Sequence, residues 1–364
     1  MHVGVLSHFG PGYSGGRIHA WFLVEALACL GHRVTVCADN RPAFLDEFAA
    51  FPGHEAIRIV CAPAFRFALP PDLDVLVCVP DLVGHWSMYA KAIEYVRKHT
   101  ARFVLLSFET PNWKHAEVPT EFPVSEDYGS VEASRLADVI LANSRLSRDM
   151  AQAYFTDSPA WFTYLYPPIH TATADAVPEP PQREKRILLI SRFAPRYKNA
   201  HRFVELLSAA CRGYEFVFIE NGQMHGNTAE TYRAACARVG ARFRTARAVT
   251  EREKFALLKS GVLTVYPSTF EGYGLPPVES LYCGVPCLAF DLPVLREVHG
   301  DDLIYAPKGD FAAMRALLGH TLETLPEVAV DRTALRCHPF MASFTEGLGA
   351  IMERLAAMGK RRPA

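Results

Sequence analysis

The sequence lacks a strong charge of either sign and lacks any long apolar run. Its 38 lysines and arginines nearly balance 39 aspartates and glutamates, and the net charge of −1 leaves no electrostatic footprint for nucleic acid. No membrane-length apolar span and no signal peptide are visible. We therefore expect a cytoplasmic protein that does not bind nucleic acid.

Cysteine patterns typical of disulfide frameworks or metal sites are also missing. The nine cysteines are an odd number scattered through core-like segments, which predicts reduced and buried thiols. Cys283 and Cys287 have no second Cys/His pair with ligand spacing nearby, so we expect them to pack in the core.

Short apolar segments instead alternate with helical stretches along the whole chain. The strand-like segments are 2–7, 33–38, 57–61, 74–79, 102–107, 138–142, 186–191, 215–219, 241–245, 262–266 and 286–290. This alternation is typical of parallel sheets covered by helices on both faces, and 364 residues predict about two domains.

The two halves are separated by a segment rich in proline and small residues. We expect an α/β chain of two Rossmann-like domains facing each other across a cleft. Their predicted bounds are residues 1–165 for the first domain, 166–182 for the linker, 183–340 for the second domain and 341–364 for a final helix with a basic tail.

Two carboxylates eight positions apart, Glu271 and Glu279, are the most informative residues. An apolar strand precedes Glu271, and a glycine-rich turn with a Pro-Pro pair suited to a helix start lies between the two. Both carboxylates and the helix N–H groups would then lie at the carboxyl end of the sheet. Carboxylates can accept hydrogen bonds from sugar or ribose hydroxyls, and N–H groups can donate to phosphate. Together these groups predict a nucleotide-sugar site.

Two cations, Arg192 and Lys198, follow the first strand of the second half. A diphosphate leaving group needs positive charge where negative charge accumulates, and arginine and lysine both supply it. Arg196 in the same loop is a competing phosphate ligand, and surface cations after a strand are the structural alternative.

The stretch from Pro267 to Glu297 resembles the E-x7-E signature of the retaining glycosyltransferases of family four, which have the GT-B fold. The Arg192 to Asn199 loop resembles that family's Arg…Lys phosphate loop, and the Gly15-Gly16 pair stands where the family has a glycine turn. Asp138 to Ser144 and Tyr166-Pro167-Pro168 are similar to the end of its first domain.

The resemblance implies a metal-independent hexosyltransferase that retains anomeric configuration and needs no cofactor besides a UDP- or GDP-linked sugar. It assigns catalysis to Arg192, Lys198 and Glu271, with the departing phosphate helping to deprotonate the acceptor hydroxyl. Glu279 would bind the ribose. The remaining donor contacts would come from Gly15, Gly16, Gly272, Tyr273, Gly274 and Leu275.

The chain departs from the family at the end of the segment 102–107, where many members have a histidine. Glu109 stands there, with His115 a few residues on. A carboxylate can orient a hydroxyl or support positive charge on the sugar, so we expect Glu109 at the reaction centre. An ion pair with Lys114 is the structural alternative. Asp81 and His115 are candidate acceptor ligands.

Three other interpretations remain open. Gly10-x-Gly12-x-x-Gly15 with Asp39 matches the dinucleotide fingerprint of a nicotinamide-dependent oxidoreductase. The second interpretation is a GT-B protein that binds nucleotide-sugar without catalysing its transfer. Asp72-Leu73-Asp74 matches a metal-binding D-x-D, although we expect a turn into a strand there.

The acceptor would be a saccharide, a lipid-linked saccharide or a small molecule. The final helix, about 341–358, is apolar on one side, and in the family such a helix packs back on the first domain. Its basic end is more typical of a solvated tail, with peripheral contact to the inner face of the membrane as the alternative.

Overall fold

The computed structural model describes residues 1–9, 14–42, 44–45, 47, 51, 53–79, 86–119, 129–191, 195–220, 224, 227–325, 330–332, 335–337 and 339–361. The chain forms two compact units. Unit 1 comprises Met1–Pro168 and Phe340–Ala364, and unit 2 comprises Ile169–Pro339. Most of the segment expected as a linker therefore belongs to unit 2, where residues Thr171–Asp175 form helix α6.

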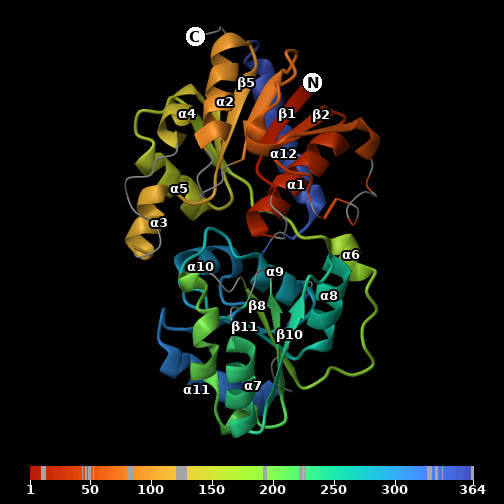
Figure 1. Cartoon of the computed structure of the whole chain (residues 1–364), viewed down its shortest axis with the longest axis vertical. Helices are drawn as coiled ribbons and strands as arrows, with labels where there is room; N and C mark the ends of the chain where they lie inside the picture. Colours follow the sequence, from red (N-terminus) through yellow and green to blue (C-terminus); the bar gives the residue numbers. More distant parts are fainter. Residues whose placement is uncertain are drawn as a thin grey trace. The chain divides into compact units, whose positions relative to one another are not determined.

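Unit 1 is built on a seven-stranded sheet in which all neighbouring strands are parallel (Figure 1). The strand order is β3-β2-β1-β4-β5-β6-β7. The strands are β1 (His2–Ser7), β2 (Arg33–Ala38), β3 (Ile57–Cys61), β4 (Val75–Cys78), β5 (Arg102–Ser107), β6 (Val139–Ala142) and β7 (Trp161–Tyr164).

The central strands of unit 1 are apolar along their middle residues because both of their faces are covered. Alternate residues of a strand point to opposite faces. Val75 and Val77 of β4 pack in one core, while Leu76 and Cys78 of the same strand pack in the other. Continuous apolar runs are what a parallel sheet between two helical layers requires.

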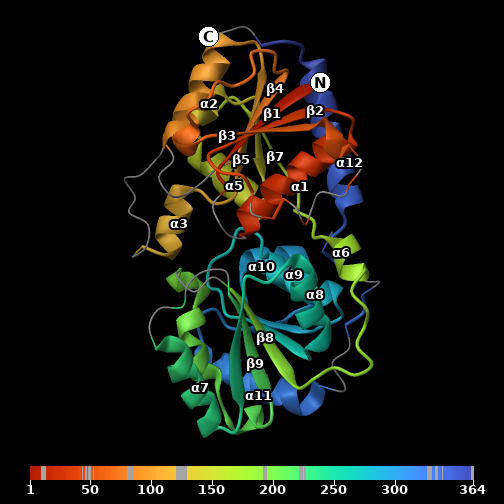
Figure 2. The same ribbon diagram turned by 45° about the vertical axis from the view of Figure 1, so that its right-hand side comes forward.

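The helices that cover unit 1 divide between these two cores. One core holds α1 (Gly15–Cys29) and α12 (Met341–Ala357), which lie side by side in Figures 1 and 2. The other holds α2 (Trp86–Lys98), α4 (Ser130–Leu136) and α5 (Arg145–Tyr154). The short segments are η1 (His54–Ala56), η2 (Pro63–Phe65) and α3 (Pro111–Glu117).

Helix α12 packs through one apolar stripe, and the chain after it is held to unit 1. The stripe consists of the buried residues Phe344, Leu348, Ile351, Met352 and Leu355. Beyond the helix, Arg102 Nε donates to the Gly359 carbonyl at 2.7 Å, and the Arg361 amide donates to the Thr100 carbonyl at 3.0 Å. The basic end is therefore docked as far as residue 361.

Unit 2 has a six-stranded parallel sheet with the order β10-β9-β8-β11-β12-β13. The strands are β8 (Arg186–Ser191), β9 (Glu215–Glu220), β10 (Arg242–Arg247), β11 (Leu263–Tyr266), β12 (Cys287–Phe290) and β13 (Ile304–Ala306). In both sheets the order reverses beside the first strand, which in this fold class places ligands at the carboxyl ends of the strands.

Two groups of helices cover the sheet of unit 2. Contacts join η4 (Ala200–Leu206), η5 (Ala209–Cys211), α7 (Thr228–Arg238) and α11 (Phe311–Thr324) in one layer. Contacts also join α6, α8 (Glu251–Ser260) and α9 (Leu275–Tyr282) in the second layer. Figure 2 shows α7 and α8 on opposite sides of β8 and β9. The remaining segments are η3 (Arg196–Lys198) and α10 (Pro293–His299).

Each segment expected as a strand contains one, but the sequence did not predict β7 and β13. Both are terminal strands of their sheets, and all four residues of β7 are only half-buried. A short strand covered on one side has no continuous apolar run to reveal it.

The cysteines differ in part from expectation. All nine are free, and seven are buried, but Cys29 and Cys61 are exposed. Within the described ranges, no helix is both long enough and apolar enough to span a membrane.

Candidate functional site

Two loops at the carboxyl edge of the sheet in unit 2 are joined by hydrogen bonds. Asn199 has a left-handed backbone, with φ of 53°, and its side-chain amide donates to the carbonyls of Tyr197 at 3.0 Å and Pro267 at 2.9 Å. The Thr269 amide in turn donates to the Tyr197 carbonyl at 2.9 Å. The loop that follows β8 is thereby fixed to the loop that follows β11.

This connection brings Lys198 to Glu271. Lys198 Nζ donates to Glu271 Oε1 at 2.5 Å, and the Tyr266 hydroxyl donates to the same oxygen. The Lys198 and Glu271 side chains are only 14% and 8% exposed. Burial and the Glu271 charge raise the pKa of Tyr266 well above its ordinary value, so this phenol stays a donor. Within the described chain Glu271 Oε2 has no hydrogen-bond partner and can accept from a ligand.

The turn after Glu271 leads directly into helix α9. Gly274 is its N-cap with φ of 93°, a backbone conformation that glycine adopts without strain, and a Cβ there would lie 3.0 Å from Leu295 Cδ2. Leu275 opens the helix and two prolines follow, which have no N–H groups. The backbone donors of this helix start are therefore confined to the turn and Leu275, fewer than an ordinary helix start offers.

Glu279, in the second turn of α9, belongs to a buried cluster of three charges. Lys254 Nζ in α8 donates to Glu279 Oε1 at 2.7 Å and to both oxygens of Glu251 at 2.6 and 2.8 Å. Burial alone would lower the pKa of Lys254, but the two carboxylates outweigh burial and raise it. Oε2 of Glu279 has no hydrogen-bond partner among the described residues.

Lys254 and Glu251 belong to this candidate site, and sequence reasoning missed them. They occur in Glu251-Arg-Glu-Lys254, which resembles an ordinary charged helix start with a capping box at Thr250. The signal that could have found them is the apolar face on which Lys254 lies, beside Phe255 and Leu258.

Several predicted positions fall outside the described residues or outside these contacts. Arg192 and Asp81 are outside the described residues, as are Gly10 and Gly12. Arg196, the competing phosphate ligand, is exposed in η3. Ser280, which follows Glu279, is fully buried and donates to the Val285 carbonyl at 2.9 Å, so its hydroxyl is used in packing.

Unit 1 holds the glycine pair at the start of α1. Ser14 is the N-cap, with its hydroxyl accepting from the Arg17 amide at 3.4 Å, and Gly15 and Gly16 form the first turn. A Cβ on Gly16 would lie 3.3 Å from the ring of Phe108, which follows β5. Glycine therefore favours close packing of α1 against the end of β5, whatever it does for a ligand.

Glu109 follows β5 and contacts Lys114, the structural alternative considered above. Lys114 Nζ lies 3.4 Å from Glu109 Oε2, and the two side chains are 5% and 19% exposed. Thr110 is the N-cap of α3, and His115 is half-buried in that helix. Because Glu109 keeps partial exposure at the carboxyl edge of the sheet, the ion pair leaves it accessible to a ligand.

The residues behind the dinucleotide-binding and metal-binding interpretations have structural partners. The Asp39 carboxylate accepts a hydrogen bond from the Phe9 amide at 3.1 Å and also bonds the His8 ring. Both of its oxygens therefore bind the segment that follows β1, where the dinucleotide interpretation would have them bind a ribose. Asp74 accepts the His2 amide at 2.8 Å, and Asp72 pairs with Arg33. Among the described residues no three or more His, Cys, Asp or Glu side chains are grouped as metal ligands require.

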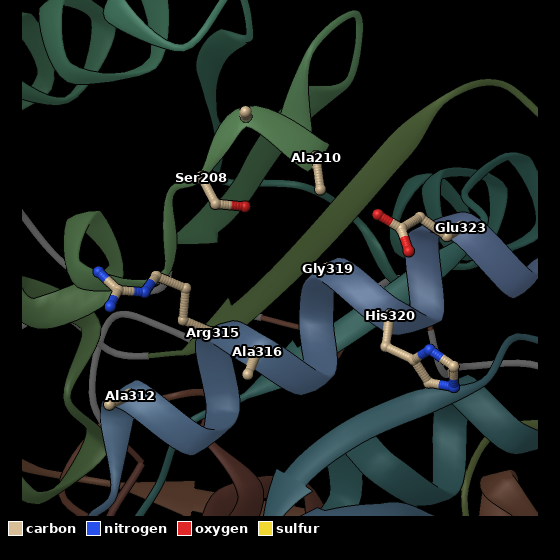
Figure 3. Close-up of a pocket in the computed structure, with 9 residues that line it drawn as sticks. Ser208, Ala210, Ala312, Arg315, Ala316, Gly319, His320 and Glu323 are labelled. Carbon is tan, nitrogen blue, oxygen red and sulfur yellow. The ribbon is translucent and has the colours of Figure 1, made fainter.

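A shallow pocket on unit 2 contains none of the predicted residues. It lies between η5 and α11, and its apolar lining is mostly alanine and glycine (Figure 3). Arg315, His320 and Glu323 lie along its α11 side and Ser208 on the other. Because the pocket contains none of the predicted residues, we place the candidate site at the Lys198–Glu271 and Lys254–Glu279 contacts.

Comparison with known proteins gives a family match in unit 2. Residues 171–316 match the family model described as glycosyl transferases group 1. The O-antigen chain mannosyltransferase B of Escherichia coli is 41% identical over 63 residues, 17% of this chain and 16% of that protein. The O-antigen chain mannosyltransferase RfbU of Salmonella typhimurium is 31% identical over 84 residues, 23% of each. These matches span less than a quarter of either relative.

Similar solved structures cover nearly the whole chain. HepE of Anabaena, in complex with UDP and glucose, has a TM-score of 0.73 at 13% identity over 97% of this chain and 100% of that one. Sucrose-phosphate synthase of Thermosynechococcus elongatus has a TM-score of 0.70 at 16% identity over 98% and 100%. Such low identities establish the fold alone. The predicted GT-B fold of two Rossmann-like domains is confirmed.

Proposed function

Because the chain is a GT-B protein whose residues 171–316 match the group 1 glycosyl transferases, we propose that it transfers a hexosyl residue from a nucleoside-diphosphate sugar with retention of configuration. The observation that carries the proposal is the contact of Lys198 with Glu271 at 2.5 Å, on the loop that leads to Glu279. This contact places a lysine that would bind the diphosphate next to a carboxylate that would bind the sugar. The names of the two curated relatives favour mannose as the hexose.

Lys198 can bind the leaving phosphate while it keeps its hydrogen bond to Glu271. An ammonium has three N–H donors, and contacts to Glu271 and to the Tyr266 hydroxyl at 3.4 Å use two of them. The third is available for a phosphate oxygen. Charge on that oxygen grows as the glycosidic bond breaks, so the lysine stabilises the transition state more than the ground state. Arg192 would add a bidentate contact.

The carboxylates would hold the two sugars of the donor. Oε2 of Glu271 accepts a hydroxyl of the hexose, and Oε2 of Glu279 accepts a ribose hydroxyl. The departing phosphate oxygen, held by Lys198, takes the proton of the acceptor hydroxyl as the new glycosidic bond forms on the same face. In this scheme no protein nucleophile is needed, and the cationic side chains supply the charge that a divalent metal provides in other glycosyltransferases.

The acceptor in this proposal is a saccharide, free or lipid-linked, with Glu109 and His115 of unit 1 as its contacts. The names of the relatives favour a growing polysaccharide chain. Peripheral membrane contact through the basic end has less support, because the Arg361 guanidinium donates to the Leu136 carbonyl of unit 1.

A donor screen followed by a turnover assay tests the proposal. We expect UDP- or GDP-sugars to raise the melting temperature of the protein, and we expect one of them to be consumed with release of nucleoside diphosphate when a saccharide acceptor is present. Binding without consumption would indicate the non-catalytic alternative. Quenching by NADH without any response to nucleotide-sugars would indicate the oxidoreductase.

A further inference from the structure

Glu220, the last residue of β9, is a buried carboxylate at the carboxyl edge of unit 2. Its side chain is 0% exposed. In register it lies between Ser191 at the end of β8 and Arg247 at the end of β10. No sequence motif marks Glu220, and the phosphate and sugar contacts proposed above do not involve it.

The two carboxylate oxygens of Glu220 differ in their hydrogen-bond partners. Oε2 accepts from Arg247 Nε at 3.0 Å. Oε1 is buried and has no hydrogen-bond partner within the described part of the chain. A buried carboxylate oxygen without a donor is costly, so its presence at a ligand-binding edge indicates that a ligand supplies the donor.

The position of Glu220 fits the base of the nucleotide. Ser191 directly precedes the loop proposed to hold phosphate. Arg247 lies three residues before Thr250, the N-cap of α8, and α8 carries the Lys254 that bonds Glu279. Glu220 thus lies along the same edge as both the phosphate loop and the ribose carboxylate, next to the strand that leads to α8.

We propose that Glu220 reads the base of the donor and makes the site selective for guanine, an inference that rests on the proposed function. Guanine has two adjacent donors on its Watson–Crick edge, N1–H and the N2 amino group. A carboxylate can accept both at once. Arg247, whose side chain is 55% exposed, has further N–H groups for the neighbouring O6 acceptor.

The other bases match this pair of side chains less well. Uracil has one donor, N3–H, between two carbonyl oxygens that a carboxylate repels. Adenine and cytosine each have one amino group beside an acceptor nitrogen. A site built to accept two hydrogen bonds rejects a base that lacks one of them, because the buried oxygen is then left unpaired.

The first test uses the unaltered protein, so it does not depend on a variant that folds. Isothermal titration calorimetry would compare GDP, UDP, ADP and inosine diphosphate, whose base lacks only the N2 amino group of guanine. We expect GDP to bind at least about 10-fold more tightly than UDP and ADP. Inosine diphosphate should bind about 10-fold more weakly than GDP, because one charge-assisted hydrogen bond is lost.

The second test removes the charge at nearly constant shape. Glu220→Gln should weaken GDP about 10- to 100-fold and change UDP by less than about threefold. Glu215→Gln is the matched control, because Glu215 begins the same strand and pairs with Arg186 at 3.2 Å at the opposite edge. It should leave both affinities unchanged.

The outcomes separate this inference from the proposed function. Equal binding of UDP and GDP by the unaltered protein would overturn the guanine assignment and leave the transferase proposal standing. Equal losses for both nucleotides in Glu220→Gln would show a structural role for the Arg247 pair and would also overturn it. Absence of binding by every nucleoside diphosphate would overturn the proposed function itself.

Discussion

The ammonium of Lys254 lies 2.7 Å from a carboxylate oxygen of Glu279, and both side chains are less than one-tenth exposed. The same ammonium holds Glu251, so one cation is shared by two buried carboxylates. This arrangement places a positive charge against Glu279 and fixes the orientation of its carboxylate before any nucleotide binds. Lys254 is thus a positioning residue for the proposed ribose contact.

Replacing Lys254 should therefore affect the nucleotide site in a pH-dependent way. In Lys254→Met two buried carboxylates lose their cation, so we expect a loss of stability of about 3–5 kcal/mol and a raised pKa for the pair. In this variant nucleoside diphosphate affinity should then rise with pH as the carboxylates that lost their cation ionise. Calorimetric titrations between pH 6 and pH 9 would measure it.

Two variants serve as controls for this prediction. Lys254→Arg keeps the cation and should retain most of the nucleotide affinity. Glu251→Gln in the Lys254→Met background removes one of the two buried charges and should recover stability. A folded Lys254→Met protein that binds nucleotide normally at every pH would rule out the positioning role.

Lys198→Ala should mainly affect catalysis. Loss of a cation that acts on growing charge costs roughly 10²–10³ in turnover. The stability should fall modestly as well, because the side chain is only 14% exposed and pairs with Glu271. Turnover of the sugar donor by the folded variant is the measurement.

Lys185→Ala is the control for Lys198→Ala. Lys185 is exposed and immediately precedes Arg186, the first residue of β8, at the opposite end of that strand. Its removal should leave turnover unchanged. Wild-type turnover in a folded Lys198→Ala protein would exclude this lysine from the mechanism.

The sequence predicted what depends on local pattern. Continuous apolar runs revealed the inner strands, and the strand, glycine turn and Pro-Pro start predicted that Glu271 lies on the loop and Glu279 within α9. Contacts between distant segments were not predictable. The bond of Lys198 to Glu271 depends on Asn199, and Lys254 looks like any surface lysine until α8 packs on α9. Glu220 has no motif and is recognisable only by its burial.

The contact between Glu109 and Lys114 allows a catalytic role of Glu109 to be separated from a structural one. If Glu109 contacts the reacting sugars, Glu109→Gln should lower turnover at least about 10-fold while nucleotide affinity stays unchanged. If its role is to neutralise the buried Lys114, the loss should appear in the melting temperature instead. Lys114→Met combined with Glu109→Gln should then restore stability. Wild-type turnover with altered stability would leave only the structural role.

Glu25 in α1 predicts a distinct pH dependence of stability. It is 6% exposed, and burial raises its pKa to about 8. Between its ordinary pKa of 4.5 and 8 the folded chain keeps this proton and the unfolded chain does not, so the free energy of unfolding falls as pH rises. The loss is about 1.4 kcal/mol for each pH unit.

Glu25→Gln should remove this dependence, because the amide has nearly the shape of the protonated acid and never ionises. Urea unfolding at pH 5, 6.5 and 8 should show variant and unaltered protein close together at pH 5, with the variant increasingly more stable at higher pH. Glu353→Gln in α12, where the side chain is exposed, should give curves parallel to those of the unaltered protein. A constant difference between the Glu25→Gln and unaltered proteins across this range would show that Glu25 is ionised in the folded state.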